Sequence, residues 1–260
     1  MKKMIHFASD WNEGQKEVLN KYGITPKEGF SAIQIDYDLY LKLELYFKNW
    51  DISGIPYPEF TKEELKKSLL SAKNGGHEFG YPMPAMNFGY KNLTYDLTNY
   101  CHSCGIGLKQ KDAFRLKNVP PEGKKRIFSI GWVFDELFVD KKLYEEVFKP
   151  LDIQCREVLQ FKKDIPFENT VQLILQETEE QLDLPDNPIE KCTTCGRTKY
   201  QPMPQDFYPM YKNVIAPIFK SSDYFGSGAS AYKRIFITKE LRETIIKLKV
   251  EKEDWYFPTK

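Results

Sequence analysis

The sequence predicts an α+β protein that combines mixed sheets and helices with two zinc-knuckle turns joined at one metal site. Three observations lead to this fold class. Apolar runs typical of strands are interspersed with capped helical segments. A Cys-x-x-Cys-Gly motif occurs twice, and a brief strand followed by a capped helix also recurs. At 260 residues, the chain can bury a sizeable core as one large domain or two modest ones.

The first elements are predicted from the spacing of apolar residues. Residues 3–7 have the pattern of a short strand, and residues 12–22 that of a short helix. From Ile33 to Phe47 every odd position is apolar, which by period alone predicts one very long strand. The alternative is a strand over 33–35, with Asp36 as the N-cap of a following helix. The buried stripe of that helix would comprise Leu39, Leu43, Tyr46, Phe47 and Trp50.

The next signals separate an N-terminal region from the remainder. Thr61-Lys62-Glu63-Glu64 is a capping box that predicts a helix through about Ala72, and Asn74-Gly75-Gly76 ends it. The Pro-, Gly- and Met-rich stretch over 77–90 is expected to be a loop. We therefore expect an N-terminal α+β region over residues 1–95 and a double-CxxCG, zinc-binding α+β region over residues 96–260. Further strands are predicted at 93–100, 126–134, 158–162, 170–176 and 255–258.

Two short motifs carry the clearest chemistry: Cys101-His102-Ser103-Cys104-Gly105 and Cys192-Thr193-Thr194-Cys195-Gly196. In each motif two thiolates converge on one point, while the glycine supplies a backbone shape that a Cβ would obstruct. Four soft thiolates with no open position predict one structural zinc held by Cys101, Cys104, Cys192 and Cys195. Rubredoxin-type iron, disulfides and free thiols are the alternatives. His102 could replace a cysteine, but a residue between two ligating cysteines usually points away from the metal.

The strand and capped helix recur at three places in the chain. Residues 137–147 align with residues 235–245, and the start of both aligns with residues 33–39. Each copy has a brief apolar strand, an Asp or Thr cap and a Leu three residues after the cap. The two later copies each follow a knuckle, which predicts a knuckle-strand-helix unit that occurs twice. Chance is the alternative, because capped helices after strands are common.

Composition restricts the classes of partner and the compartment. The formal net charge is +1, from 38 Lys plus Arg against 37 Asp plus Glu, so no global field would draw the protein to nucleic acid or anionic lipid. The apolar stretch at the N-terminus is too short for a secretory signal, and no stretch approaches membrane-spanning length. Five cysteines, four of them in the knuckles, indicate a reducing compartment. We expect a cytoplasmic protein without a membrane partner.

No catalytic set stands out in the sequence. The chain has three histidines, and neither His6 nor His77 accompanies a nucleophile or carboxylate pattern. Cys155 is expected to be an inert buried thiol, although Arg156 beside it could lower its pKa. Residues 225–230 lack the lysine of a phosphate-binding loop, so a flexible surface loop is expected. Asp135 and Glu136 near Asp140 could bind a cation, but a helix-start role explains Asp140 more simply.

Opposite charges are segregated along the chain. Eight acids and no Lys or Arg lie between residues 164 and 190, whereas Lys109 to Arg126 is rich in basic residues. One interpretation is a pair of solvated loops that face each other. The other is an acidic docking face for a basic protein, with apolar contact from Leu182, Leu184 and Ile189. The acids assigned to this acidic face are Glu177, Glu179, Glu180, Asp183 and Asp186.

The repeated knuckle, followed each time by a strand and a capped helix, resembles the bacterial double-CXXCG motif family. The likeness covers roughly residues 96–260, and it carries over residue by residue only at the two Cys pairs with Gly105 and Gly196. Some members are described as immunity proteins that neutralise a toxin delivered between neighbouring cells. The resemblance thus implies a non-enzymatic protein that binds a cognate protein toxin, stabilised by structural Zn²⁺.

Two other classes of function stay open from the sequence. A zinc-ribbon nucleic-acid-binding or transcription accessory protein would use the basic residues between Lys109 and Arg126 on phosphates. Salt-dependent nucleic-acid binding would reveal it. An enzyme whose site is assembled from distant residues is the third possibility, and a deep pocket with perturbed pKa values would favour it.

Overall fold

A computed structural model describes residues 1–120, 123, 125–185, 187–202 and 206–260. The chain divides into two compact units, one built mainly on Met1–Glu64 and the other on Leu65–Pro202 with Tyr208–Lys260. The division falls after Glu64 rather than at the expected residue 95, because β4 (Leu70–Lys73) pairs with C-terminal strands of the second unit. Among the described residues, no helix is long and apolar enough to cross a membrane.

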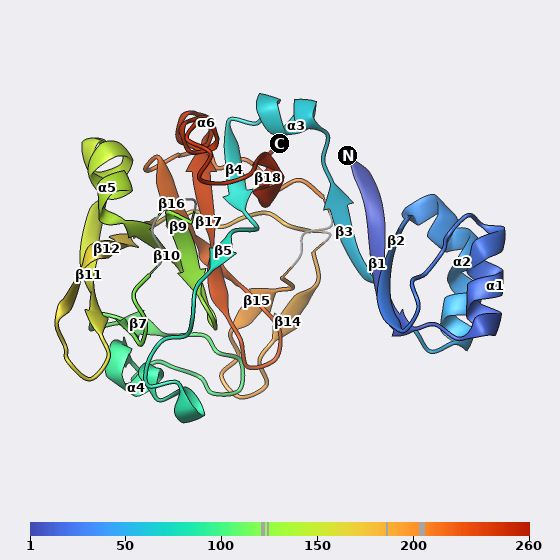
Figure 1. The fold of residues 1–260 in the computed structure, drawn as a ribbon, viewed down its shortest axis with the longest axis horizontal. Helices are drawn as coiled ribbons and strands as arrows, with labels where there is room; N and C mark the ends of the chain where they lie inside the picture. Colours follow the sequence, from blue (N-terminus) through green and yellow to red (C-terminus); the bar gives the residue numbers. More distant parts are fainter. Residues whose placement is uncertain (121–122, 124, 186, 203–205) are drawn as a thin grey trace. The chain divides into compact units, whose positions relative to one another are not determined.

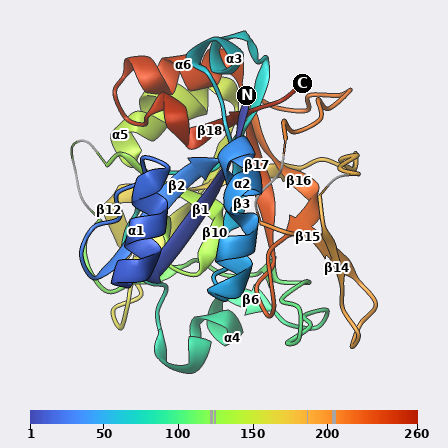
Figure 2. The same ribbon diagram turned by 90° about the vertical axis from the view of Figure 1, so that its right-hand side faces the viewer.

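The first unit is a three-stranded antiparallel sheet in the order β2-β1-β3, with two helices packed on one face (Figures 1 and 2). Its elements are β1 (Lys2–Asp10), α1 (Glu13–Lys21), β2 (Phe30–Asp36), α2 (Tyr37–Asn49) and β3 (Ile55–Glu59). The strand-then-helix alternative for residues 33–47 is confirmed, because Asp36 Oδ1 accepts a hydrogen bond from Leu39 N at 2.8 Å. Leu43 and Phe47 are buried as expected, whereas Tyr46 is exposed.

The predicted helix through Ala72 is wrong in its second half. The capping box is present, because Thr61 Oγ1 and Glu64 Oε2 each accept from the other residue's backbone N–H. However, α3 spans Lys62–Lys67, and the chain then enters β4. β4 lies between β17 (Tyr232–Thr238) and β18 (Tyr256–Pro258), so its backbone groups pair on both sides and Leu70 and Ala72 are buried. Long-range strand pairing overrides the local helical signal.

The second unit contains two large sheets and one small one. The six-stranded sheet has the order β5 (His77–Glu78), β9 (Ile127–Ile130), β10 (Val133–Asp140), β12 (Pro166–Ile174), β11 (Gln154–Gln160) and β8 (Arg115–Leu116). The seven-stranded sheet has the order β14 (Ile189–Lys191), β15 (Thr198–Tyr200), β16 (Ile218–Phe225), β17, β4 and β18, and β13 (Gln176–Glu177) pairs with β16. β6 (Tyr95–Asp96) pairs with β7 (Lys109–Gln110). The expected strand over 93–100 is therefore mostly wrong, since the chain forms α4 (Tyr90–Thr94) and then only the short β6.

The helices of the second unit cap and cover these sheets. Asp140 begins α5 by accepting a hydrogen bond from Leu143 N at 2.7 Å, as the sequence predicts. α5 and α6 lie at the same end of the unit (Figures 1 and 2). The helical segments are α5 (Lys141–Leu143), which continues into a π turn (Tyr144–Phe148) and a 3-10 turn (Lys149–Leu151), α6 (Lys239–Lys247), and the 3-10 turns Met86–Phe88 and Glu253–Trp255.

Residues that align between the segments 137–147 and 235–245 share one core. Four matched pairs, each 98 positions apart, are buried in the same cluster: Leu137 with Ile235, Val139 with Ile237, Leu143 with Leu241, and Val147 with Ile245. Two further matched pairs touch each other directly. The rings of Phe134 and Tyr232 lie 5.2 Å apart, and Lys233 N donates to Asp135 Oδ2 at 3.2 Å. Strands β10 and β17 therefore contact each other although they belong to different sheets.

Candidate metal centre

The two knuckles bring four sulfur atoms together. The Sγ atoms of Cys101, Cys104, Cys192 and Cys195 all lie within 4.8 Å of one another. Cys101 Sγ is 3.8 Å from Cys192 Sγ, and Cys104 Sγ is 3.7 Å from Cys195 Sγ. These separations exclude disulfides, whose sulfur atoms lie about 2 Å apart. All four expected ligands thus meet at one possible metal-binding site.

Both knuckles fold in the same way. Gly105 N donates to Cys101 O at 2.8 Å, and Cys101 N donates to Ile106 O at 2.9 Å. The second knuckle repeats both bonds at 2.9 Å, from Gly196 N to Cys192 O and from Cys192 N to Arg197 O. Gly105 and Gly196 have positive φ angles of 83° and 73°, which glycine adopts without steric cost. Thr194 Oγ1 also donates to the matching Ser103 Oγ at 2.9 Å.

The sulfur geometry fits a tetrahedral ion. Four thiolates about 2.3 Å from a central ion would place their sulfur atoms about 3.8 Å apart. The two closest cross-knuckle separations, 3.7 and 3.8 Å, match this edge length. His102 is exposed, and its ring stands at 4.7 Å against Tyr100 outside the sulfur cluster. The donor set is therefore four sulfurs, which leaves no position for a fifth ligand in a tetrahedral site.

Arg197 supplies charge beside the second knuckle. Its Nε donates to Cys195 Sγ at 3.3 Å, and its Nη2 donates to Asn99 O at 2.9 Å, just before the first knuckle. The bond from Arg197 is the main reason that the pKa of Cys195 falls to about 6. Burial instead raises the pKa of Cys104 to about 12. Sequence reasoning missed Arg197. A cation two residues after a ligating cysteine is visible in the sequence and indicates a side chain that can bond to the sulfur.

Lys199 is a second residue that sequence reasoning missed. It is buried, and its Nζ donates to Cys104 O at 3.0 Å, Gly228 O at 2.5 Å and Ser230 O at 3.1 Å. One ammonium group thus joins the first knuckle to the glycine-rich loop over 225–230. That loop has its tip on the surface as expected, and Lys199 anchors it.

The acidic face differs from the expectation in its apolar part. Leu182 and Leu184 are buried at 5% and 8% exposure, so only Ile189, at 61%, is available for contact. Glu177 pairs with Lys233, and Glu180 accepts backbone N–H groups of a neighbouring loop. Glu179 and Asp183 are exposed, and Asp186 lies outside the described residues. The leucines pack inward because burying apolar side chains is favourable.

The basic segment is partly neutralised within the molecule. Arg115 forms ion pairs with Asp112 and Asp164, and the second of these pairs joins the basic segment to the acidic one. Arg126 contacts Asp140 and Glu146. Lys124 lies outside the described residues. The sequence analysis offered the interpretation that the two oppositely charged segments face each other. The ion pair between Arg115 and Asp164 confirms this at one point of contact.

The remaining candidates have structural partners. Cys155 is half-buried and packs against the main core, and His77 stacks edge-on against Trp255 at 4.9 Å. Glu136 is buried, and its carboxylate lies 2.5 Å from Lys220 Nζ and accepts from Gln172 Nε2 at 2.9 Å. Burial alone would lower the pKa of Lys220, but the attraction of Glu136 and Asp135 raises it. Glu136 is thus paired with an internal cation.

Comparisons with family models, curated proteins and solved structures gave no match to this chain. The resemblance to the double-CXXCG family therefore rests on the six knuckle residues. The class that the fold and site define is an α+β protein with a possible four-cysteine metal centre.

Proposed function

We propose that the four cysteines hold one structural zinc ion. The single observation that supports zinc is the pair of cross-knuckle sulfur separations, 3.7 and 3.8 Å, which suit a tetrahedron of thiolates. Such a closed site contributes folding free energy and offers no position to a substrate. Metal analysis of protein purified without chelators should find one zinc per chain, and Cys104→Ser should remove it. Iron at that stoichiometry, with a red colour, would instead indicate a rubredoxin-type site.

We further propose that the protein is a cytoplasmic, non-enzymatic immunity protein that binds and neutralises a cognate protein toxin. The convergence of two distant knuckles on one closed thiolate cluster carries this proposal. It matches the motif arrangement of the family that the chain resembles and leaves the metal without a catalytic role. Binding a partner through the surface is compatible with such a centre.

Glu179 and Asp183 are the acids on the acidic face that suit a basic partner. Glu177 and Glu180 already bind groups within the chain, so changing them would disturb the fold as well as the surface. Exposed carboxylates attract a basic partner and accelerate its association. The nucleic-acid alternative has less support, because Arg115 and Arg126 already contact carboxylates.

The test combines partner capture with a protection assay. The protein is expressed with its genomic neighbours and examined by native mass spectrometry, which reports both bound zinc and a stoichiometric companion. The double variant Glu179→Lys/Asp183→Lys should lose the companion and the protection of cells, while its melting temperature stays unchanged. Glu28→Lys/Asp254→Lys reverses two exposed acids outside the acidic segment and serves as the matched control.

The outcomes separate the parts of the proposal. Capture and protection that survive in the double variant would place the interface on another surface. Zinc without a protein companion, together with bound nucleic acid released by salt, would replace the immunity function with the zinc-ribbon alternative.

A further inference from the structure

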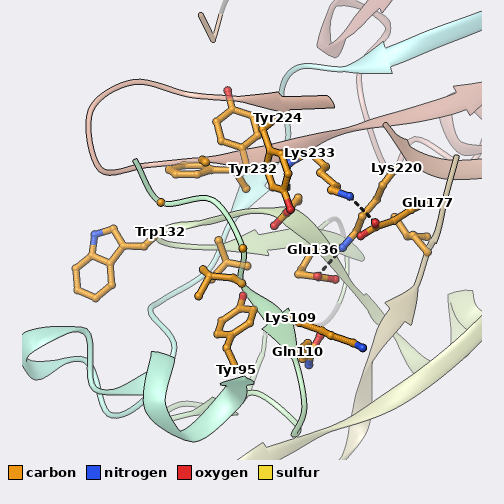
Figure 3. A pocket seen from close by; sticks show the side chains of 18 of the residues that line it. Tyr95, Lys109, Gln110, Trp132, Glu136, Glu177, Lys220, Tyr224, Tyr232 and Lys233 are labelled. Atoms are coloured by element: carbon orange, nitrogen blue, oxygen red, sulfur yellow. Dashed lines mark hydrogen bonds and ion pairs between the residues drawn. The ribbon is translucent and has the colours of Figure 1, made fainter. Parts of the chain in front are cut away.

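A cavity of about 590 Å³ opens between the two repeats, beside the first knuckle. Strands β10 and β12 line one side, β16 and β17 line another, and Gly105 and Gly107 bring the knuckle to its wall. Figure 3 shows charged and aromatic side chains from both sheets converging on this space. Its size lies within the range of about 300–1,000 Å³ that small-molecule sites occupy.

The acidic side chains of the cavity are already matched by internal donors. Glu136 binds Lys220 and Gln172, and Glu177 binds Lys233 (Figure 3). Asp135 accepts the backbone N–H of Lys233 at 3.2 Å. Gln172 is fixed in turn by Gln110, since the two amides exchange hydrogen bonds of 2.9 and 2.7 Å. Each of the three acids is therefore held by a hydrogen bond or an ion pair within the chain.

Positive charge remains in surplus in the cavity. Its lining contains five cationic side chains against three acidic ones. Lys220 and Lys233 neutralise two of the acids, and Arg197 binds a knuckle sulfur. Lys109 forms no ion pair with any described residue. Arg156 has a buried Nη1 without a hydrogen-bond partner in the described part of the chain.

Arg156 lines the cavity with a guanidinium that the described part of the chain leaves incompletely paired. Leaving such a donor without a partner is unfavourable, and more so when the group is charged. Arg156 lies opposite Gln172 in the pairing of β11 with β12, and both residues line the cavity. A planar guanidinium of this kind suits the two oxygens of a carboxylate or phosphate.

Aromatic rings form another part of the wall. Tyr224, Tyr232 and Trp132 line the cavity (Figure 3). Tyr232 is held in place between Phe134, at 5.2 Å, and the guanidinium of Arg234, at 5.3 Å. Lys233 Nζ likewise lies 5.0 Å from the centre of the Tyr224 ring, so a planar group would pack against the edges and remaining faces of these fixed rings.

We propose that this cavity binds a small organic anion that carries a flat aromatic ring. Arg156 and Lys109 contact its carboxylate or phosphate, and the tyrosines pack against its ring. The site is separate from the acidic face, so the inference stands independently of the immunity function.

The test measures binding to the zinc-loaded, full-length protein by isothermal titration calorimetry. Benzoate and adenosine 5′-monophosphate are the two anionic probes, and benzamide and adenosine are their neutral counterparts. At least one anion should bind saturably and about tenfold more tightly than its neutral counterpart. The probe that binds then distinguishes a carboxylate ligand from a phosphate ligand.

Substitutions of the cationic lining residues test whether the anion binds in this cavity. Lys109→Gln and Arg156→Gln should each weaken anion binding about tenfold, whereas Lys111→Gln, which is exposed and outside the cavity lining, should leave it unchanged. If Arg156→Gln fails to fold, the anion affinity of Lys109→Gln, a change at an exposed position, tests the proposal. Absence of saturable binding by both anions, equal binding of the neutral probes, or unchanged affinity in Lys109→Gln would overturn the proposal.

Discussion

The two knuckles share a sequence pattern and a backbone hydrogen-bond pattern, yet their surroundings differ. In the first knuckle Cys101, Cys104, Gly105 and Ile106 are all buried. In the second knuckle only Cys192 is buried, while Cys195 and Gly196 are exposed. The position equivalent to the buried Ile106 is Arg197, which donates a hydrogen bond to a sulfur. The first knuckle is therefore packed inside the protein, whereas most of the second knuckle lies on its surface.

This difference indicates how a metal held by the four cysteines would stabilise the protein. The first knuckle is supported by packing against the loop over 225–230, so its shape has support besides the metal. The second knuckle depends on the sulfurs, on Arg197 and on the bond between Thr194 and Ser103. Zinc would then act mainly as the link that keeps the second knuckle on the first.

Removal of the metal is expected to have the largest effect. Structural zinc contributes on the order of 10 kcal/mol of apparent binding free energy in small domains, so Cys104→Ser should unfold the knuckle region. Treatment with a chelator should increase amide hydrogen exchange in the second knuckle before the first. Equal exchange in both knuckles would contradict the distinction drawn between them. The first unit, with its own core, should keep its protection throughout.

Substitution of the two glycines is the next largest test. In Gly105→Ala the new Cβ would lie 2.5 Å from Ala229 O at a positive φ, so we expect a loss of roughly 3–5 kcal/mol in unfolding free energy. In Gly196→Ala nothing lies within 4 Å, and only the conformational cost of about 1–2 kcal/mol applies. Chemical denaturation of both variants measures the difference. Similar losses would mean that the first knuckle is not constrained by the neighbouring loop.

Lys199 connects the two environments, because it follows the second knuckle and binds the carbonyl of Cys104 in the first. Lys199→Met keeps most of the buried volume but leaves carbonyl acceptors without their donor. We expect a loss of about 2–3 kcal/mol in unfolding free energy. Lys191→Met changes an exposed lysine nearby and is the matched control. A variant as stable as the control would show that water replaces the ammonium group at no cost.

Features set by local spacing could be predicted from the sequence. The cysteine pairs with their glycines, and the helix caps at Asp36 and Asp140, each depend on residues three or four positions apart. Pairing between distant segments could not be predicted in this way. The segment over 70–73 continues a helical pattern, but it becomes a central strand because β17 and β18 bind it on both sides.

The candidate metal site and the cavity were likewise predictable only in their local features. The ligand set is predictable because each knuckle is local, and the repeat between residues 137–147 and 235–245 is visible as a sequence match. The roles of Lys199 and Arg156 depend on which carbonyl groups or cavity the folded chain brings near them. The exposed fraction of the leucines on the acidic face likewise depends on tertiary packing.

The smallest expected effect concerns the contact that distinguishes the second knuckle, from Arg197 to Cys195. Protons compete with the metal for a thiolate, and the bond from Arg197 lowers the pKa of Cys195 to about 6. Arg197→Ala should raise that pKa and weaken zinc binding about 10- to 100-fold, as loss of outer partners does. Competition with a chromogenic chelator measures the affinity.

The dependence of this effect on pH follows from the sign of the pKa change. At pH 6 and below, the variant's Cys195 holds its proton more tightly than the wild-type residue does, so the affinity gap is widest at acidic pH. As the pH rises past about 9, near the ordinary value for a thiol, both proteins carry the thiolate and the gap should narrow. Ile106→Val, the matched change in the first knuckle, should cost about 1 kcal/mol of stability through lost packing. Because the side chain of Ile106 donates nothing to a sulfur and its backbone N–H is unchanged in Ile106→Val, this variant should follow the wild-type pH profile. An altered profile would show that both knuckles tune the metal alike.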